Sequence, residues 1–357
     1  MEKGYRKLSQ KELSEIRKIL IIQQKPFGDI LLNTGYFAEL RRHFPEAQID
    51  YLIQKPYATI LEDNPHIDNL VLMDKTKGLK RLITYIKVIY TVRKTKYDLI
   101  IDQLRGTSSV RIVAFSGARW RLGFKMENKK RMGITFHRWN WIYNLSVPKG
   151  ETRYYSRWKF DALLPLGITE VEHNTYYHVK PESFDYVNKW ISKEGLLDKK
   201  LVIFSPGTPV RKKQWDLGYY SQLADRIQSE LDYHVILLWG PGEKDDVLYI
   251  KEKMQTIPTI ACPTTFNQAG ALLHAGEFLI TNDGGINHLS VSREVPSISI
   301  FGPKSSPIKW CAWHKPIHLY LKDTNFKNFD DNRFNITPDQ VFEKVLELVR
   351  ILQEQNK

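Results

Sequence analysis

The residues best suited to chemistry follow an apolar run in the second half of the chain. Phe278-Leu279-Ile280 predicts a buried strand, and Thr281-Asn282-Asp283-Gly284-Gly285-Ile286-Asn287-His288-Leu289 comes directly after it. A strand, an Asp-Gly-Gly turn and a helix together present the free N–H groups of a helix N-terminus to an anion. Glycine also lets the backbone approach a phosphate closely. We therefore expect this turn to bind a phosphate, with Asp283 and His288 at its mouth.

A second loop with chemical groups lies far upstream, at Lys25-Pro26-Phe27-Gly28-Asp29-Ile30, after the apolar run Ile19–Ile22. Asp29 precedes a predicted helix, so it is either the N-cap of that helix or a general base at the carboxyl end of a strand. The two roles do not exclude each other. Two such loops in two halves of one chain predict two domains that face each other across a cleft.

The stretch Phe204-Ser205-Pro206-Gly207-Thr208-Pro209-Val210-Arg211-Lys212-Lys213-Gln214-Trp215 also follows a predicted strand. A loop of Gly, Pro and Thr with a cluster of cations suits a phosphate, because hydroxyl and backbone donors orient it and the lysines neutralise its charge. The alternative is a charged surface loop. The spacing matches neither a Walker A motif nor GxGxxG.

A further strand-to-helix connection, Leu238-Trp239-Gly240-Pro241-Gly242-Glu243-Lys244-Asp245-Asp246, is rich in acids. A carboxylate here could accept hydrogen bonds from a ribose, as in other nucleotide-binding α/β folds. Glu243, Asp245 and Asp246 could equally be acidic residues that the dipole of a following helix favours.

The elements that must position these loops alternate between short strands and helices. Strands are predicted at 19–22, 49–53, 70–73 and 98–101, and again at 201–204, 234–239, 278–280 and 297–301. Helical patterns lie between them, and a final amphipathic helix begins near Pro338, with Thr337 as its cap. This alternation predicts two doubly wound α/β domains, whose ligands bind beyond the carboxyl ends of the strands.

Length and composition narrow the class of protein. The 357 residues fit two domains, and the chain contains no apolar run near 18 residues and no apolar stretch near Met1 typical of a signal peptide. Cys262 and Cys311 are the two cysteines, which fits a reducing cytosol and plain packing roles. The ten histidines form no HxxxH or HxH pair, so we expect no metal site.

The net charge of +13 is concentrated in the first half. One basic run comprises Lys75, Lys77, Lys80, Arg81, Lys87, Arg93, Lys94 and Lys96. Another, within 119–141, combines Arg119, Arg121, Lys125, Lys129, Lys130, Arg131 and Arg138 with Trp and Phe. Such surfaces attract nucleic acid, anionic membranes or acidic glycolipids, or they are simply solvated. The sequence has no helix-turn-helix, zinc-finger or RNP-like motif that would support nucleic-acid binding.

The order and spacing of four motifs resemble glycosyltransferase family 9, the ADP-heptose:lipopolysaccharide heptosyltransferases, from about residue 17 to 355. The motifs are Lys25–Asp29, the loop ending at Trp215, Gly240–Asp246 and Asp283–Leu289. Lys309-Trp310-Cys311-Ala312-Trp313 looks most like the heptosyltransferase III-type branch. The resemblance implies a GT-B fold with an acceptor-binding Rossmann-like domain at 1–175 and a nucleotide-sugar-binding domain at 176–335. A C-terminal helix at 336–357 is expected to pack back toward the first domain.

The resemblance also implies roles for single residues. Asp29 matches the catalytic base of an inverting, metal-independent transfer, and the donor would be ADP-heptose. The positions that match donor-binding residues are Thr208, Lys212 or Lys213, Glu243, Asp283, Gly284, Gly285 and His288. Family members often carry Thr or Ser where Gly284 stands, so a hydroxyl contact to the donor is expected to be lost.

The basic first half then has an expected partner, a lipopolysaccharide core or lipid A precursor at the inner face of the cytoplasmic membrane. Acceptor or membrane contacts are expected from Lys25, Arg119, Arg121, Lys129, Lys130 and Arg131. We expect a cytoplasmic, peripheral enzyme that binds no nucleic acid. The alternatives are another GT-B nucleotide-sugar enzyme, such as an epimerase, and a non-catalytic lipopolysaccharide-binding relative.

Overall fold

The computed structural model describes residues 4–126, 129–131, 134–136, 139–148, 150, 153–169, 174–324 and 334–355, and side chains in 129–136 are outside this description. The chain divides into two compact units, residues 1–178 and 179–357. Among the described residues, no strand or helix is present between Ile168 and the start of the helix at Pro181, where one unit gives way to the other.

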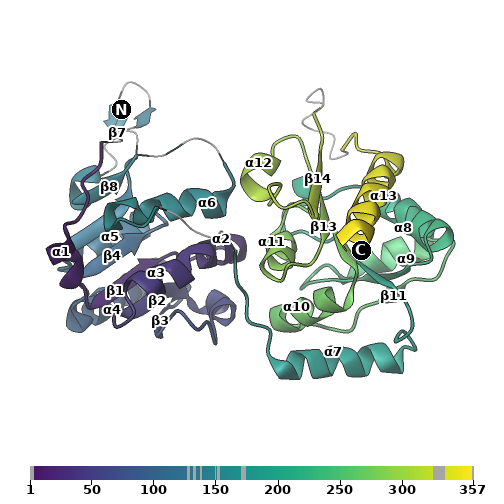
Figure 1. Ribbon diagram of the computed structural model, residues 1–357, viewed down its shortest axis with the longest axis horizontal. Coiled ribbons are helices and arrows are strands. Elements are labelled where there is room, and N and C mark those ends of the chain that lie inside the picture. The colour runs from purple at the N-terminus through teal and green to yellow at the C-terminus, as the bar shows by residue number, and fades with distance from the viewer. Residues whose placement is uncertain are drawn as a thin grey trace. The chain divides into compact units, whose positions relative to one another are not determined.

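The first unit is built on a parallel six-stranded sheet of order β3-β2-β1-β4-β5-β8 (Figure 1). Its strands are β1 (Lys18–Ile22), β2 (Gln48–Gln54), β3 (Asn69–Met73), β4 (Leu99–Asp102), β5 (Trp120–Phe124) and β8 (Leu145–Val147). The central strands are buried almost completely, as is usual for a parallel sheet covered on both faces.

Helices connect these strands and cover the sheet. They are α1 (Gln10–Ser14), α2 (Phe27–Asn33), α3 (Phe37–His43), α4 (Gly78–Thr95), α5 (Thr107–Phe115) and α6 (Tyr155–Phe160), with short 3-10 turns at 34–36, 55–60, 140–142 and 161–166. A two-stranded antiparallel ribbon, β6 (Lys129–Arg131) and β7 (Ile134–Phe136), extends from the connection between β5 and β8.

The second unit repeats the architecture with a parallel sheet of order β11-β10-β9-β12-β13-β14. Its strands are β9 (Leu201–Ser205), β10 (His234–Leu237), β11 (Thr259–Ile260), β12 (Phe278–Asn282), β13 (Ser297–Phe301) and β14 (His318–Lys322). The helices are α7 (Pro181–Lys193), α8 (Leu217–Glu230), α9 (Lys244–Lys253), α10 (Phe266–Ala275), α11 (Gly285–Ser292), α12 (Pro307–Trp310) and α13 (Pro338–Gln355), with a 3-10 turn at 211–213. Both sheets have the strand order of a dinucleotide-binding fold.

The last helix packs within the second unit. Thr337 caps it as predicted, together with Gln340, since the Gln340 N–H donates to Thr337 Oγ1 and the Thr337 N–H donates to Gln340 Oε1. Helix α13 packs on α8 and β14, and its apolar face, which includes Val341 and Val345, belongs to the core of the second unit. It does so because this face completes the apolar layer around the buried Trp215.

The basic, aromatic stretch 119–141 is also partly different from the expectation. Trp120 and Phe124 lie on β5 and are buried, and the ring of Phe124 stacks on Trp158 with the centroids 4.1 Å apart. Trp139 and Trp141 are exposed. These two aromatic residues therefore stabilise the sheet rather than form a surface. The expectation differed because the sequence pattern did not reveal β5.

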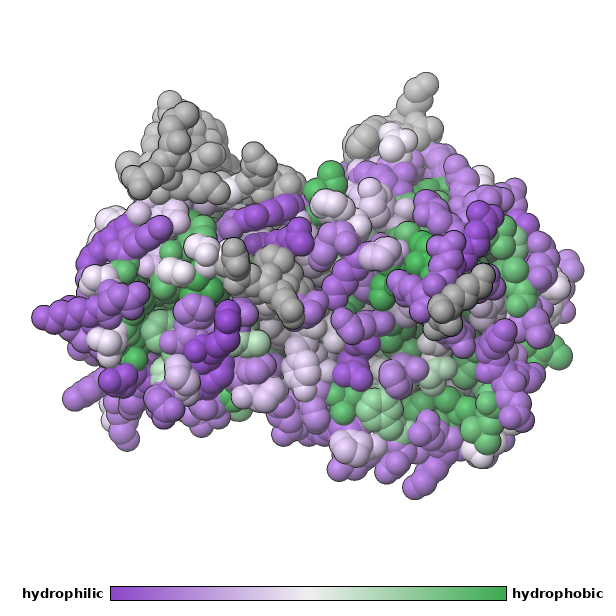
Figure 2. Space-filling model, in the orientation of Figure 1, coloured by the Kyte–Doolittle hydropathy of each residue, from purple (hydrophilic) through white to green (hydrophobic). Residues whose placement is uncertain are grey.

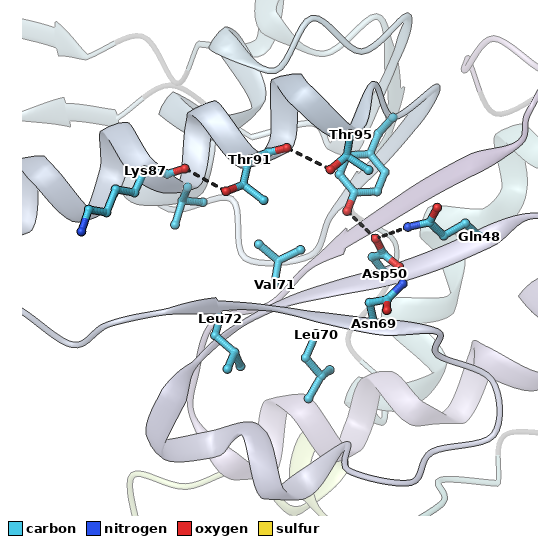
Figure 3. A pocket seen from close by; sticks show the side chains of 11 residues that line it. Gln48, Asp50, Asn69, Leu70, Val71, Leu72, Lys87, Thr91 and Thr95 are labelled. Carbon is cyan, nitrogen blue, oxygen red and sulfur yellow. Dashed lines mark hydrogen bonds between the residues drawn. The ribbon is translucent and has the colours of Figure 1, made fainter.

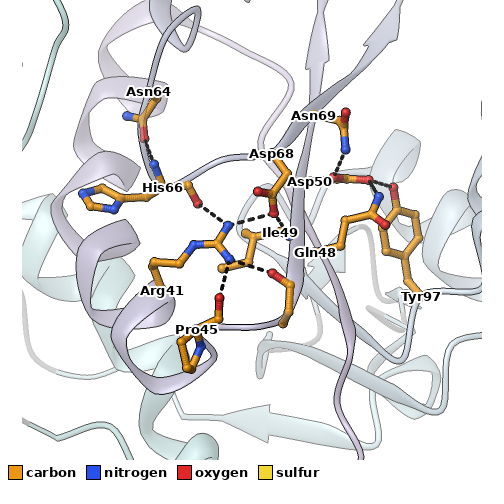
Figure 4. A network of polar contacts seen from close by, with 11 residues as sticks. Arg41, Pro45, Gln48, Ile49, Asp50, Asn64, His66, Asp68, Asn69 and Tyr97 are labelled. Atoms are coloured by element: carbon orange, nitrogen blue, oxygen red, sulfur yellow. Dashed lines mark hydrogen bonds and ion pairs between the residues drawn. The ribbon is translucent and has the colours of Figure 1, made fainter.

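Polar contacts link the helices and loops at the amino end of the first sheet. Arg41 on α3 donates to the carbonyls of Ala47, Pro45 and His66 and pairs with Asp68 at 2.7 Å (Figure 4). Beside this network, a pocket of about 360 Å³ lies between α4 and the ends of β2 and β3 (Figure 3). Both features lie at the opposite end of the sheet from the loop that contains Asp29.

No helix in the described part of the chain combines the length and the apolar character needed to cross a membrane. The face in Figure 2 is mostly hydrophilic, with apolar residues scattered among charged ones.

Candidate active site

The strand order of each sheet reverses between its two central strands, β1 and β4 in the first unit and β9 and β12 in the second. Loops that leave the carboxyl ends of such a strand pair diverge and leave room for a ligand. Asp29 follows β1, Lys213 follows β9 and Asp283 follows β12. The residues singled out in the sequence thus lie at the two places where an α/β fold binds ligands.

In the second unit, a salt bridge joins the loop after β9 to the turn after β12. Lys213 Nζ lies 2.7 Å from Asp283 Oδ2, and Asp283 is buried whereas the Lys213 side chain remains 39% exposed. The hydroxyl of Ser305 donates to the same carboxylate oxygen. The pair therefore fixes the ammonium group at the turn while leaving one side of it accessible.

The other two cations of the cluster have different surroundings. Arg211 donates to both oxygens of the buried Asp246, at 2.7 and 2.8 Å, and so ties its loop to α9. Lys212 is exposed and has no ion-pair partner among the described residues. The geometry thus separates the three cations: Lys213 lies at the turn, Arg211 is structural and Lys212 extends into solvent.

Asn282 holds the loops in place, a role that was not assigned from the sequence. This buried side chain accepts from the Trp215 N–H at 2.9 Å and donates to the Pro206 carbonyl at 2.7 Å. A short polar residue at the end of a buried strand, directly before Asp283, was the signal that could have identified it.

Helix α11 begins directly after the turn. Gly284 is extended, and a Cβ placed on it would meet only the Asn282 carbonyl, at 3.9 Å. The position therefore has space for a hydroxyl side chain. His288 is buried one turn later, where burial lowers the pKa of its imidazole to about 4, and its Nδ1 has no hydrogen-bond partner among the described residues. A neutral imidazole with an unused ring nitrogen is suited to contact a ligand.

Glu243 lies close to the loop after β9. Its Oε2 accepts from the Gly240 N–H at 2.9 Å, and burial raises the pKa of its carboxyl. A Cβ on Gly207 would lie 2.1 Å from that oxygen, so only glycine permits this approach. Thr208 is buried beside it, and its hydroxyl accepts from the Val210 N–H at 3.3 Å. The hydrogen bond from Gly240 leaves the second oxygen of Glu243, Oε1, available to a ligand.

Lys322, at the end of β14, was not identified from the sequence. Its ammonium group donates to the carbonyls of Gly302, Pro303 and Ser305, so it shapes the loop that brings the Ser305 hydroxyl to Asp283. Burial lowers the pKa of Lys322.

In the first unit, Asp29 is the third residue of α2. The helix begins at Phe27, Pro26 occupies the N-cap position, and no side chain caps it. The N-cap interpretation of Asp29 is therefore wrong, because the helix starts at Phe27, three residues before Ile30, where a helix capped by Asp29 would start. Burial raises the pKa of the Asp29 carboxyl, which also has no hydrogen bond to another described residue.

Lys159 on α6 provides the positive charge that acts on Asp29. It is almost fully buried and donates to Gln23 Oε1 at 3.0 Å and to the Gln103 carbonyl at 2.9 Å, at the ends of β1 and β4. Burial lowers the pKa of Lys159 to about 8, and Asp29 and Asp102 oppose this shift. In turn, Lys159 lowers the pKa of Asp29. A lysine inside an aromatic run gave no sequence signal of this role.

Lys25 lines a pocket of about 220 Å³ beyond the ends of β1, β2 and β3. The other residues at the pocket are Gln24, Gln54, Met73, Asp74, Lys75, Thr76, Lys77, Arg81, Tyr85 and Ser108. Gln24 is 1% exposed and accepts from the Ser108 hydroxyl, but its amide Nε2 has no partner among the described residues. An unpaired buried donor among four cations is suited to an anion.

Arg119 and Arg121, two of the other predicted acceptor contacts, lie on or beside β5. Arg119 precedes β5 at the amino end of the sheet, pairs with Glu15 and lies over the Trp120 ring. Arg121 donates to the carbonyls of Ile142 and Ala118. Both guanidinium groups therefore have structural partners. Lys129, Lys130 and Arg131 form strand β6, but their side chains lie outside the described part of the chain.

Among the described residues, no three His, Cys, Asp or Glu side chains are grouped in a way that could hold a metal ion. Cys311 is buried, and Cys262 is half-buried.

Comparison with known proteins identifies the family. The family model for glycosyltransferase family 9 (heptosyltransferase) matches residues 85–333. The chain is 26% identical over 293 residues to lipopolysaccharide heptosyltransferase 3 of Escherichia coli, covering 80% of this chain and 83% of that protein. Its fold matches the glycosyl transferase family 9 structure from Veillonella parvula DSM 2008, with a TM-score of 0.79, 21% identity and coverage of 94% and 97%.

It also matches E. coli heptosyltransferase WaaC with ADP-2-deoxy-2-fluoro heptose, with a TM-score of 0.69, 14% identity and coverage of 92% and 99%. These likenesses cover most of the chain. The protein belongs to glycosyltransferase family 9 and is a glycosyltransferase.

Proposed function

We propose that this enzyme transfers a heptose from ADP-heptose to the inner core of a lipopolysaccharide precursor, with inversion at the anomeric carbon and without a metal ion. The donor class comes from the family description and from the ADP-heptose analogue named for a relative. The acceptor class comes from the name of the E. coli lipopolysaccharide heptosyltransferase 3 relative. We further propose that it works at the inner face of the cytoplasmic membrane.

The observation that carries the donor assignment is the Lys213–Asp283 pair at the start of α11. A helix N-terminus offers N–H groups and a positive dipole end, and the ammonium group beside it, held by Asp283 with one side accessible, adds a charge-assisted donor. This combination suits a diphosphate leaving group. Glu243 Oε1 is then available to accept from a ribose hydroxyl, and the unused nitrogen of His288 to contact the donor.

The proposed reaction moves one proton and one glycosyl group. Asp29 accepts the proton of an acceptor hydroxyl while that oxygen attacks the anomeric carbon. The bond from that carbon to the diphosphate oxygen breaks, and ADP leaves with the electron pair. Fixed charges at Lys213 and α11 stabilise the negative charge that develops on the leaving group. Lys159 keeps the half-buried Asp29 ionised, since its positive charge opposes the effect of burial on the Asp29 pKa.

The acceptor is expected to place an acidic group in the pocket that contains Lys25 and Gln24. The cations there match the phosphates or acidic sugars of an inner core, and the free Gln24 amide supplies a hydrogen bond. Electrostatic attraction of this kind speeds association and depends on salt.

The test measures ADP release from ADP-heptose with a deacylated lipopolysaccharide core acceptor, in EDTA. Acceptor-dependent release, with a mass gain of one heptose on the acceptor and an inverted anomeric configuration by NMR, supports the proposal. Turnover that stops in EDTA and returns with a divalent cation contradicts metal independence. No turnover and no donor binding by calorimetry contradict the donor assignment and direct the search to other nucleotide-sugars.

The two neighbouring lysines provide a matched test of the donor site. Lys213→Met should weaken ADP binding by about tenfold or more, since a charge-assisted contact is worth at least about 1.5 kcal/mol. Lys212→Met, which removes the same charge one residue away, should change it less than about twofold. Equal effects in calorimetry would show that Lys213 has no special position.

A further inference from the structure

Helix α4 in the first unit has two apolar faces, and only one of them is used by the fold. Tyr85, Val88 and Val92 point into the core. Five large side chains on the opposite face are largely exposed, Leu79 by 75%, Leu82 by 54%, Ile83 by 47%, Ile86 by 58% and Tyr90 by 66%. Their spacing of three or four residues places them in one stripe along nearly the whole helix.

A row of cations runs along one side of this stripe. Lys80, Lys87 and Lys94 recur every seven residues, so they lie on one face of α4, and Figure 3 shows Lys87 extending away from the helix. All three are exposed, and none has an ion-pair partner among the described residues. Residues 75–97 contain eight Lys and Arg residues and no Asp or Glu.

The other side of the stripe is apolar and basic as well. Arg93 donates to the carbonyl of Phe115 at the end of α5, and the Phe115 side chain is 60% exposed. Single exposed apolar residues are common on soluble proteins, but five on one helix face, continued by a sixth on a neighbouring helix, mark a contact surface.

The charges decide between two occupants of this surface. A second copy of the chain would bring its own basic row against this one in a twofold contact, with no acidic residue in the segment to offset the repulsion. An anionic lipid surface instead offers acyl chains to the stripe and phosphates to the lysines.

We propose that α4 is an interfacial helix that holds the enzyme on an anionic membrane, with the stripe of Leu79, Leu82, Ile83, Ile86 and Tyr90 among the acyl chains. Lys80, Lys87 and Lys94 contact lipid phosphates. The proposal rests on the proposed function in one respect, because a lipid-anchored acceptor gives the enzyme a reason to bind membranes. It assigns the contact to α4 and does not depend on 119–141, where Trp120 and Phe124 are buried and Trp139 and Trp141 are exposed.

The test is sedimentation of the full-length protein with vesicles. The protein should bind vesicles that contain phosphatidylglycerol and not vesicles of phosphatidylcholine alone, and binding should fall as salt increases. Leu82→Gln/Ile86→Gln should reduce the partition coefficient by about tenfold or more, because two large side chains lose their burial in lipid. Leu248→Gln/Ile257→Gln, which changes two exposed apolar residues of the second unit, should leave binding unchanged.

The charge row is tested separately. Lys80→Glu/Lys87→Glu/Lys94→Glu should abolish binding to the anionic vesicles, whereas Lys189→Glu/Lys193→Glu/Lys200→Glu, with the same change in net charge on the second unit, should retain most of it. Equal loss in the two sets would show a general charge effect and would overturn the assignment to α4.

Two further results would overturn the proposal. One is wild-type protein that does not bind the anionic vesicles. The other is a wild-type dimer, by light scattering, that Leu82→Gln/Ile86→Gln converts to a monomer, because the stripe would then join two copies. Turnover of a deacylated, water-soluble acceptor should be the same for wild type and the α4 variants. Vesicle binding without any turnover would refute the proposed function and leave the interfacial helix standing.

Discussion

Two aspartates in the first unit, at opposite ends of the same sheet, have opposite surroundings. Asp50, in the amino-terminal half of β2, is 2% exposed and accepts from Gln48 Nε2 at 2.7 Å, Asn69 Nδ2 at 2.9 Å and the Tyr97 hydroxyl at 2.5 Å (Figure 4). Asp29, beyond the carboxyl end of β1, has no such donors among the described residues, and burial raises the pKa of its carboxyl.

The difference separates a structural carboxylate from one available for chemistry. Three donors leave Asp50 no need for solvent, and burial together with Asp50 raises the pKa of the Tyr97 hydroxyl, which therefore remains a donor. The charge of Lys159 and the N-terminus of α2 stabilise the ionised Asp29, and no hydrogen-bond donor among the described residues occupies its oxygens, which remain available to a proton. A fully hydrogen-bonded carboxylate stabilises the fold, whereas a partly desolvated one without donors is a stronger base.

The comparison is tested most strongly at Asp29. Asp29→Asn should lower kcat by about 10²–10⁴, because general-base assistance of that size is lost, while ADP binding is retained. Steady-state kinetics and calorimetry measure the two quantities. Turnover within twofold of wild type would show that another group accepts the proton.

The same variant has a second expected result in unfolding experiments. A carboxyl whose pKa is raised in the folded state is ionised more easily in the unfolded chain, so its ionisation destabilises the fold above the folded-state pKa. Asp29→Asn should therefore have an equal or higher free energy of unfolding at pH 7. This difference should vanish as the pH falls below the ordinary value of 3.8.

Asp50→Asn should show the reverse behaviour. An amide nitrogen in place of one carboxylate oxygen would face a donor, and a buried unsatisfied group costs about 1–3 kcal/mol. The free energy of unfolding should fall by that amount in urea, with kcat unchanged for the fraction that remains folded. Loss of turnover without loss of stability would mean that the amino end of the sheet also takes part in the reaction.

Much of the fold and of the candidate site could be predicted from the sequence, and part of them could not. The strand and glycine pattern located β1, β12 and the loops with Asp29, Lys213 and Asp283, because the carboxyl ends of parallel strands carry the ligands of such folds. Lys159 could not be located, since its role depends on a contact with Gln23, 136 positions away, and Lys322 could not be located because its role depends on the fold of the loop that contains Gly302 and Ser305. The strand β5 was missed because Arg121 and Gly123 interrupt its apolar residues and further basic residues flank it.

Lys159 offers a finer test of the comparison. Lys159→Met removes the charge that lowers the pKa of Asp29, so that pKa should rise. The acidic limb of the kcat/KM profile against pH should then move to higher pH, because Asp29 must be ionised to act as a base. Lys159→Arg, which keeps the charge, should restore most of the wild-type limb. A profile that is scaled down without a shift in either variant would show a packing role only.

The smallest effect is expected from the cations that surround the unpaired Gln24 amide. Lys75→Gln/Lys77→Gln should raise the KM for the acceptor by a few-fold and leave kcat unchanged, because exposed charges contribute less than about 1 kcal/mol each. The increase should disappear at high salt, where the wild type loses the same attraction. Lys199→Gln/Lys200→Gln on the second unit should have no effect on KM at any salt concentration. If the Lys75/Lys77 variant instead lowers kcat at saturating acceptor, the pocket contacts the acceptor in the transition state. The basic pocket would then contribute to the chemical step, as Asp29 does, and not to acceptor binding alone.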